Sequence, residues 1–308
     1  MSDSIVRSRL RKPRSAFSRG ALRKVDLSEN EFDHDAGVQI AEAMRAFRDA
    51  AKYMTMQQRA APAIYFLNLS FNMLESEREE LNPNTKGRGI GEEAACAILH
   101  YCEPDKLRFA GLACCGIQLG SARKDVIGQS GARVKDILDF IKEATALEQI
   151  DLRHNAIANE GYLRLGRCLL EAECKVASLA TDAFELFDGD TTFDGSKQLR
   201  IKSKADPALY PHAPSKFDDG VGTCLAAVMK HNTSLTTLDL HNCGMDSKFA
   251  TALRDGLAGC ESLQNIDFKG NSLNEKAITE IVQALETSGK CIKSFDASGV
   301  AIKDEKSI

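Results

Sequence analysis

A single pattern of apolar residues recurs along the chain and constrains its fold more than any other feature. It reads apolar-x-x-apolar-x-apolar-x-x-(Asn or Cys)-x-apolar, and Leu22, Val25, Leu27, Asn30 and Phe32 form its first copy. The alternating apolar positions predict a short strand, and a recurring strand predicts a stack of units that bury a shared core. The ninth position of the eight copies is occupied by Asn30, Asn72, Cys115, Asn155, Phe184, Cys243, Asn271 and Val300.

The ninth position is expected to have a structural role. A chain that leaves a strand in a tight turn buries backbone polar groups, and a small amide or thiol can bond them and stack on the next unit. The fifth copy keeps the spacing but carries Thr181 and Phe184 at the third apolar and ninth positions, and the last copy is truncated. The predicted structural ladder consists of Asn30, Asn72, Cys115, Asn155, Cys243 and Asn271.

A helix is predicted after each strand. Apolar residues follow the strands at three- and four-residue spacing, as in Val38, Ile40, Ala41 and Met44. Glycines placed before several helices suit the turn from strand to helix. The predicted fold is therefore α/β, a solenoid in the form of a βα horseshoe with parallel inner strands and outer helices. The glycines concerned are Gly37, Gly89, Gly161 and Gly220.

Two segments show a family resemblance most clearly. VDLSENEFDHDAGVQIAEAM (25–44) and LTTLDLHNCGMDSKFATALRDGL (235–257) resemble leucine-rich repeats of the ribonuclease-inhibitor-like kind, and the resemblance covers about residues 20–302. It implies about eight repeats and a role in holding other proteins. The family includes inhibitors, GTPase activators, actin-end cappers, immune sensors and ciliary scaffolds, so the resemblance does not select one partner.

The spacing of the copies predicts the domain boundaries. A leucine-rich-repeat domain is expected over 21–302, after a basic extended arm (1–20) and before a short tail (303–308). Three units carry extra residues between strand and helix, and we expect all three insertions on one rim of the solenoid. They could form a binding face, or they could be disordered surface loops. These insertions lie near 75–88, 118–130 and 188–216.

The N-terminal segment is strongly basic. Residues 1–24 contain eight Lys or Arg and one acid, a charge of +7, and the remainder carries 32 basic and 43 acidic residues, a charge of −11. Such an arm is expected to bind an acidic surface such as tubulin, with nucleic acid an unlikely partner. Its composition also fits a mitochondrial presequence, although a first repeat beginning at Leu22 leaves little room for cleavage. The candidate partner-binding residues are Arg7, Arg9, Arg11, Lys12, Arg14 and Arg19.

Aspartate recurs at one strand position and is expected to face the concave surface, because it alternates with the core residues. One interpretation is an acidic stripe that binds a basic partner. The other is that Asp is common at this position of the repeat and is neutralised by neighbours such as Arg153 and Lys269. The five positions are Asp26, Asp151, Asp239, Asp267 and Asp296.

The sequence offers no pattern for catalysis, a metal or a cofactor. The ten cysteines lack repeated or C-x-x-C spacing, which favours a reducing compartment, and no histidine accompanies a nucleophile motif except that His241 shares a strand face with Asp239. No apolar run approaches the roughly 18 residues of a membrane span. We therefore predict no small-molecule substrate and no transmembrane segment. Four cysteines outside the ladder are expected to be small buried groups: Cys96, Cys168, Cys224 and Cys291.

The functional prediction is a non-enzymatic scaffold for protein–protein interaction, a structural subunit of a large assembly. The resemblance favours a cytoskeletal or axonemal setting, and hence a cytoplasmic, cytoskeletal or ciliary location. One alternative is a Ran-type GTPase activator, with Arg78 or Arg88 as the candidate arginine. Another is a subunit of a mitochondrial complex.

Overall fold

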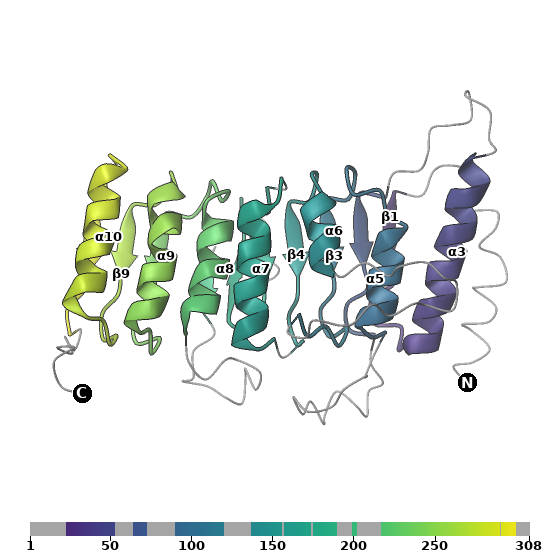
Figure 1. Cartoon of the computed structure of the whole chain (residues 1–308), viewed down its shortest axis with the longest axis horizontal. Coiled ribbons are helices and arrows are strands. Elements are labelled where there is room, and N and C mark those ends of the chain that lie inside the picture. The colour runs from purple at the N-terminus through teal and green to yellow at the C-terminus, as the bar shows by residue number, and fades with distance from the viewer. Residues whose placement is uncertain are drawn as a thin grey trace.

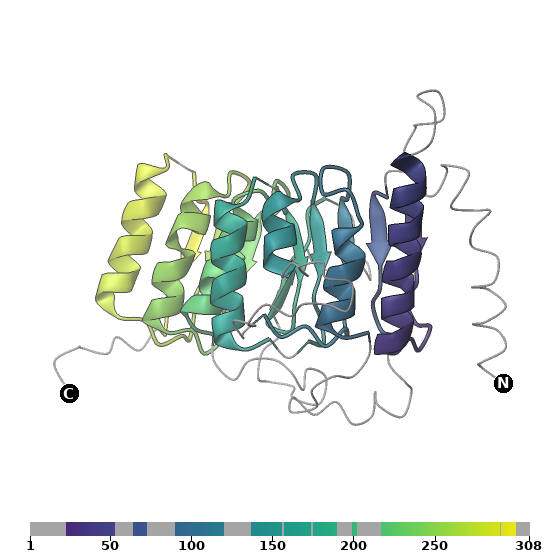
Figure 2. The ribbon, with the colours of Figure 1, turned by 45° about the vertical axis from the view of Figure 1, so that its right-hand side comes forward.

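The computed structural model describes residues 23–52, 64–72, 90–119, 137–155, 157–173, 175–189, 199–201, 217–289 and 291–299. The expected arm, the tail and the insertion at 75–88 lie outside these residues, as do most of the insertions at 118–130 and 188–216. Figure 1 shows the helices side by side in one row from α3 to α10, with the strands behind them, and the same row is visible in the turned view of Figure 2.

Each unit contributes a strand of three residues. Eight strands are in parallel registers, and they pair through residues at the same position of the repeat, as in Asp26↔Asn68 and Asp239↔Asp267. The parallel strands are β1 (Lys24–Asp26), β2 (Phe66–Asn68), β3 (Phe109–Gly111), β4 (Gln149–Asp151), β5 (Ser178–Ala180), β8 (Thr237–Asp239), β9 (Asn265–Asp267) and β10 (Ser294–Asp296).

Seven helices in the described ranges cover the outer side of the strands. The helices α9 and α10 begin at side-chain caps, because Asp246 accepts the Phe249 N–H at 2.9 Å and Asn274 accepts the Ala277 N–H at 2.8 Å. The helices are α3 (His34–Lys52), α5 (Glu92–His100), α6 (Ile137–Glu143), α7 (Asn159–Glu171), α8 (Asp219–Met229), α9 (Ser247–Gly259) and α10 (Glu275–Thr287). This is the predicted α/β solenoid.

The core lies between the strands and the helices. The middle residue of an inner strand points into it and is buried, as are Leu67, Ile150 and Leu238, and each such side chain contributes roughly 1.5–3 kcal/mol by leaving water. The corresponding residues of the first and last strands, Val25 and Phe295, are only partly buried. The array is therefore continuous inside and open at its two ends.

The fifth unit differs from the prediction. Its strand β5 pairs in parallel with β4, but Phe184, expected at the ninth position, lies on an antiparallel strand, β6 (Phe184–Leu186). A further strand, β7 (Leu199–Ile201), pairs antiparallel with β6. The insertion at 188–216 thus supplies a sheet strand as well as a connection. The apolar alternation of Phe184 and Leu186 has period two in either arrangement, which explains the error.

The glycines also differ from the prediction. Gly37, Gly161 and Gly220 lie inside the first turns of α3, α7 and α8, not before them. A Cβ atom at Gly37 would lie 2.8 Å from Ala94 Cβ and 2.8 Å from Ile90 Cγ2 of the next unit. These glycines therefore permit close packing of neighbouring units, and Gly89 lies outside the described residues.

Candidate protein-binding face

The turns after six of the eight parallel strands are built in the same way. Residues with positive φ reverse the chain, and the side chain of the last strand residue accepts the N–H two residues later, as Asp267 does from Lys269 at 2.8 Å. The same bond is made by Asp26, Asn68, Asp151, Asp239 and Asp296. The recurring aspartate therefore has a structural role in the turn. The left-handed residues are Glu29, Phe71, Cys114, His154, Asn242, Gly270 and Gly299.

Three asparagines of the predicted ladder bridge adjacent units. Asn155 Oδ1 accepts the N–H groups of Cys115 and Ile117, both at 3.0 Å. Asn155 Nδ2 donates to the carbonyls of Leu112 at 2.9 Å and Leu152 at 3.0 Å. The side chains of Asn72 and Asn271 bond the preceding unit and their own turn in the same manner. Each amide thus satisfies backbone groups that the turn removes from water.

The remaining ladder residues make fewer bonds. Cys115 donates from Sγ to the carbonyl of Leu69 in the preceding unit at 3.3 Å. Cys243 follows the irregular fifth unit, and its Sγ bonds the carbonyl of His241 in its own turn at 3.5 Å. Asn30 is exposed in the first unit, where its amide donates to the Ser28 carbonyl. The ladder is therefore interrupted at the fifth unit.

Three carboxylates form an acidic row near the C-terminal end of the concave face. Asp239, Asp267 and Asp296 occupy matched positions of adjacent strands, and all three are partly exposed. Hydrogen bonds from the backbone and side chain of Ser298 lower the pKa of Asp296, with a smaller contribution from the charge of Lys269. Backbone geometry thus holds three like-charged groups side by side. We call Asp239, Asp267 and Asp296 the acidic row.

The other two predicted aspartates are separate from this row. Asp26 is exposed, but Asn68 and Gly111 occupy the matched positions of the next two strands. Asp151 was expected to face a partner, and this expectation is corrected because its side chain is buried beneath Arg153. The predicted stripe is therefore discontinuous.

Arg153 is the centre of an internal charge cluster. Its Nη2 atom lies 2.7 Å from Asp151 Oδ2, and its Nη1 atom lies 3.6 Å from Glu185 Oε1 on β6. Burial opposes the charge of Arg153, but the hydrogen bond and charge of Asp151, together with Glu185, outweigh it and raise the pKa of Arg153. This cluster joins the repeat array to the irregular fifth unit.

Aromatic side chains occupy the N-terminal part of the same face and were not singled out from the sequence. The rings of Phe66 and Phe109 stack with centroids 4.4 Å apart and an interplanar angle of 9°. Lys24 Nζ lies 4.4 Å from the Phe66 centroid, which is a cation–π geometry. A Cβ atom at Gly111 would lie 2.3 Å from Asn68 Oδ1 and 3.0 Å from Phe109 Cε1, so this glycine makes room first for the Asn68 side chain and also for the ring. We call Lys24, Phe66 and Phe109 the aromatic row.

Comparisons with known proteins agree with this geometry. The chain is 24% identical over 178 residues to the ribonuclease inhibitor of Mus musculus, and 23% identical over 186 residues to that of Sus scrofa. The strands, outer helices and asparagine ladder coincide with the segments that carry the resemblance. The chain is similar to ribonuclease inhibitors, and its fold is a leucine-rich-repeat solenoid.

The extent of each similarity is limited. The alignments cover 57% and 59% of this leucine-rich-repeat chain but only 38% and 40% of the two inhibitors. No family model matches the chain. Among solved structures, the leucine-rich repeat-containing protein LegL7 of Legionella pneumophila aligns at 14% identity and a TM-score of 0.25, over 92% of this chain and 87% of that one. That score is too low to support an argument.

One cluster on the leucine-rich-repeat face has groups that metals bind. Asp239, His241 and Asp267 each place a potential ligand atom within 4.8 Å of the others. His241 Nδ1 lies 2.5 Å from Asp239 Oδ1, so a cation held by Nδ1 would have to replace this hydrogen bond. His241 was expected to share a face with Asp239, and its place beside Asp267 follows from the strand register.

The thiols of the repeat units are mostly enclosed. Cys96, Cys168 and Cys224 are buried as predicted, whereas Cys291, also predicted to be buried, is exposed before the last strand. Burial, with the carboxylates of Asp239 and Asp267, raises the pKa of the Cys243 thiol to about 12. That thiol is therefore protonated at neutral pH and a poor nucleophile.

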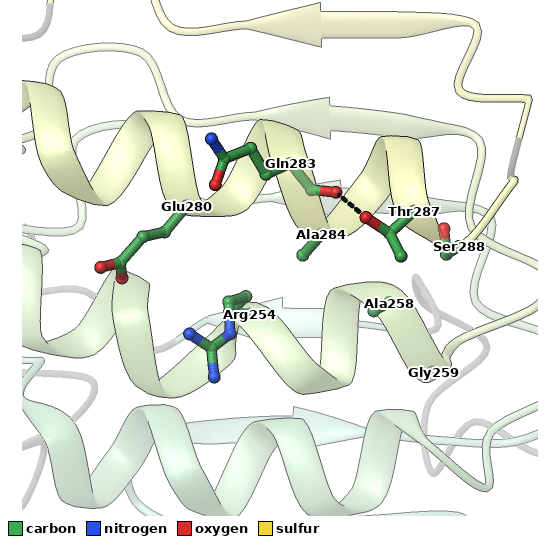
Figure 3. A pocket seen from close by; sticks show the side chains of 8 residues that line it. All are labelled: Arg254, Ala258, Gly259, Glu280, Gln283, Ala284, Thr287 and Ser288. Carbon is green, nitrogen blue, oxygen red and sulfur yellow. Dashed lines mark hydrogen bonds between the residues drawn. The ribbon is translucent and has the colours of Figure 1, made fainter.

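An open groove lies on the outer side of the leucine-rich-repeat array, between α9 and α10. It encloses about 600 Å³, and Figure 3 shows Ala284, Ala258 and Gly259 where the two helices approach, with Arg254 and Glu280 at the other end. Its Thr287 hydroxyl bonds within the helix to the Gln283 carbonyl at 2.7 Å.

Several predicted site residues lie outside the described residues. They include the basic residues of the arm (Arg7, Arg9, Arg11, Lys12, Arg14 and Arg19) and the two arginines nominated for GTPase activation, Arg78 and Arg88. Among the residues that the structure does describe, no helix is both long and apolar enough to cross a membrane.

Proposed function

We propose that the chain is a non-enzymatic scaffold that binds another protein on its concave face. The observation that carries this proposal is the aromatic row, where two stacked and partly exposed phenylalanines and a lysine lie on adjacent strands of a rigid sheet. Aromatic side chains held in fixed positions are enriched at the centres of protein interfaces. The two relatives are named for inhibiting a ribonuclease, which gives the same class of role.

The test is photo-crosslinking in cells of the native source. Benzoylphenylalanine replaces Phe109 in the full chain, and the same group at Leu170, which is 46% exposed on α7, serves as the outer-face control. We expect one recurrent partner crosslinked from position 109 and not from position 170. Recovery of the same proteins from both positions, or of none from position 109, would contradict the proposal.

A variant then separates the aromatic contact from folding. The double variant Phe66→Gln, Phe109→Gln removes both rings. Glutamine suits this strand position, because Gln149 already occupies it on the next strand, where it pairs with Phe109. We expect loss of the partner with the thermal midpoint almost unchanged, whereas Leu170→Gln retains the partner. Binding that survives the double substitution would exclude the aromatic row as the contact.

The finer expectations rest on the family resemblance. A cytoskeletal or axonemal assembly, and an arm that contacts an acidic surface such as tubulin, stay predictions that the identity of the crosslinked partner would decide. Mitochondrial location would be decided by imaging the full chain carrying a C-terminal tag. No second function is proposed, because the arginines required for GTPase activation lie outside the described residues.

A further inference from the structure

The aromatic row is bordered by exposed residues at the start of the same three strands. Arg23, Tyr65 and Arg108 precede β1, β2 and β3, and all three are exposed. The Tyr65 N–H donates to the Arg23 carbonyl at 2.9 Å, and the Arg108 N–H donates to the Tyr65 carbonyl at 2.8 Å. The three strands are neighbours in one sheet, so the backbone fixes the spacing of these residues at about 4.8 Å. We define the cationic aromatic patch as Arg23, Lys24, Tyr65, Phe66, Arg108 and Phe109.

The two phenylalanine rings present their edges, and not their faces, to the concave space. They are stacked across adjacent strands, with a centroid distance of 4.4 Å close to the strand spacing, so they stand upright on the sheet. Phe109 covers one face of Phe66, and Lys24 Nζ covers the other from the strand on the opposite side. The edge of an aromatic ring is positive, whereas its face is negative. The exposed edges therefore reinforce the positive charge of the cations.

The patch has more positive charge than its neighbours neutralise. Within the described residues, Arg23 and Lys24 make no ion pair, and Arg108 Nη1 lies 3.9 Å from Glu148 Oε1. The Arg108 and Glu148 side chains are 65% and 61% exposed, so this pair contributes little and is easily exchanged for another. Asp26, at the other end of β1, uses one of its oxygens in its own turn. The surplus of cations favours a negatively charged partner.

We infer that the cationic aromatic patch binds an acidic, extended segment of the partner protein. The inference rests on the proposed function, because it names the partner chemistry of the same concave face. Carboxylates on one side of an extended chain recur about every 6.6 Å, and β1 and β3 lie about 9.6 Å apart. A segment of about five residues that crosses the strands thus reaches from Lys24 to Arg108. There the guanidinium group can bind a carboxylate through two parallel hydrogen bonds.

Single-stranded nucleic acid is the other polyanion that binds cations and aromatic residues together. It requires free ring faces, because its bases stack on them. Both faces of Phe66 are covered, and one face of Phe109 is covered by Phe66. The outer face of Phe109 lies on the side of Gln149, its partner on β4. The geometry therefore favours carboxylates at the ring edges over stacked bases.

The test measures binding of defined peptides to the purified full chain by fluorescence anisotropy. The probe is a fluorescein-labelled peptide of about twelve residues in which Asp and Ser alternate, so that an extended chain has its carboxylates on one side. The control peptide has Asn in place of Asp. We expect the acidic peptide to bind about tenfold more tightly than the control, and this preference should disappear in about 0.5 M salt, which screens exposed charges.

Two variants with the same change in net charge separate the patch from the rest of the molecule. Arg23→Gln, Lys24→Gln, Arg108→Gln should weaken binding of the acidic peptide about tenfold, because three exposed ion pairs are lost. The control variant Arg167→Gln, Lys248→Gln, Lys276→Gln removes three exposed cations from α7, α9 and α10 and should bind like the unaltered chain. Equal weakening in both variants would overturn the inference, since net charge alone would then explain it.

A crosslinking readout locates the peptide. Benzoylphenylalanine at the centre of the acidic peptide should crosslink to residues 64–72 or 107–111. Crosslinks confined to residues 1–22 would overturn the inference, because the basic N-terminal segment would then be the binding site. Absence of binding up to about 1 mM peptide would overturn it as well.

A single-stranded oligodeoxythymidylate of similar length tests the nucleic-acid alternative. We expect it to bind the unaltered chain and the patch variant equally. Tighter binding than that of the acidic peptide, lost in the patch variant, would overturn the inference and assign the patch to nucleic acid. These experiments contain no cellular partner. If they failed while position 109 still captured one protein in cells, the proposed function would stand and the partner segment would not be acidic.

Discussion

At the scale of single residues, the turn after each strand accounts for most of the regularity of the molecule. A left-handed residue reverses the chain, a strand-end carboxylate or amide fixes the start of the turn, and a buried asparagine bonds two units at once. The asparagine is the least replaceable of the three, because each of its polar atoms serves backbone groups that have no access to water.

Replacing Asn155 tests this conclusion. In Asn155→Ala the carbonyls of Leu112 and Leu152 and the N–H groups of Cys115 and Ile117 lose their partner. We expect a loss of about 3 kcal/mol in the free energy of unfolding, measured in urea. Asn30→Ala, at the exposed end of the ladder, should cost less than about 1 kcal/mol. Equal costs would show that the interior bonds contribute little.

The thiol of Cys243 gives a second test at this scale. Its pKa of about 12 leaves roughly one thiolate in ten thousand molecules at pH 8, so iodoacetamide should label exposed Cys291 well before Cys243. The double variant Asp239→Asn, Asp267→Asn lacks the two negative charges that help to raise the pKa of Cys243, so labelling of Cys243 should accelerate. Mass spectrometry of labelled peptides measures both rates, with the unfolded chain as the reference for intrinsic reactivity. Unchanged Cys243 labelling would show that the carboxylates do not control it.

At the scale of elements, the sequence predicted seven of the eight strand–turn units and their parallel order. In six of those units apolar alternation, Asn or Cys at the ninth position and a following helical pattern agree with one another, and the truncated last copy is carried by its apolar alternation. The fifth unit carries the same alternation without Asn or Cys, and alternation alone does not distinguish a parallel repeat strand from a hairpin strand. The signal for the aromatic row was present in the sequence, because Phe66 and Phe109 occupy the same position of adjacent copies, 43 residues apart, and paired parallel strands place such residues side by side.

The hairpin of the fifth unit is anchored from the helix layer. The Tyr162 hydroxyl of α7 is fully buried and accepts the Ala183 N–H at 3.1 Å, at the bend between β5 and β6. We expect Tyr162→Phe to lower the free energy of unfolding by about 1–2 kcal/mol, because a buried donor loses a partner. Tyr101→Phe on partly exposed Tyr101 should change it by less than about 0.5 kcal/mol. Thermal unfolding of both variants would show whether the anchor exists.

At the scale of the whole molecule, the hairpin of the fifth unit changes the width of the strand layer relative to the width of the helix layer. A regular unit adds one strand of about 4.8 Å inside and one helix of about 8–10 Å outside, and this difference curves the array. From β4 to β7 there are three paired strand steps, about 14 Å, and β7 then lies near β8, which belongs to a separate sheet, while two helix steps, about 16–20 Å, lead from α7 to α9. The two extra strands add width on the inner side without an added helix, so we expect the hairpin to reduce the curvature between the aromatic row and the acidic row.

Removing the hairpin should restore the curvature. We expect that replacing residues 181–218 with the seven-residue turn 240–246, which ends at the helix-capping Asp246, gives a continuous ladder and a shorter maximum dimension in solution scattering. A matched seven-residue Gly/Ser linker lacks the ladder cysteine and should not give the same regular curve. An unchanged maximum dimension would mean that the hairpin does not set the shape.

The interruption of the ladder also affects how the molecule unfolds. Nearest-neighbour bonds transmit cooperativity along a solenoid, and asparagine bridges link the units on each side of the fifth. Across the fifth unit the connection consists of the packing of α7 against α8, the bond from the His154 N–H to Asp182 at 2.7 Å, and the Asn232 side chain, which donates to the carbonyls of Ala177 at 2.9 Å and Phe187 at 3.1 Å. The described units therefore form two blocks of asparagine-bridged repeats, joined through the fifth unit by contacts of a different kind. A ligand that contacts both blocks would stabilise the connection between them. Binding would then convert two separate melting events into one.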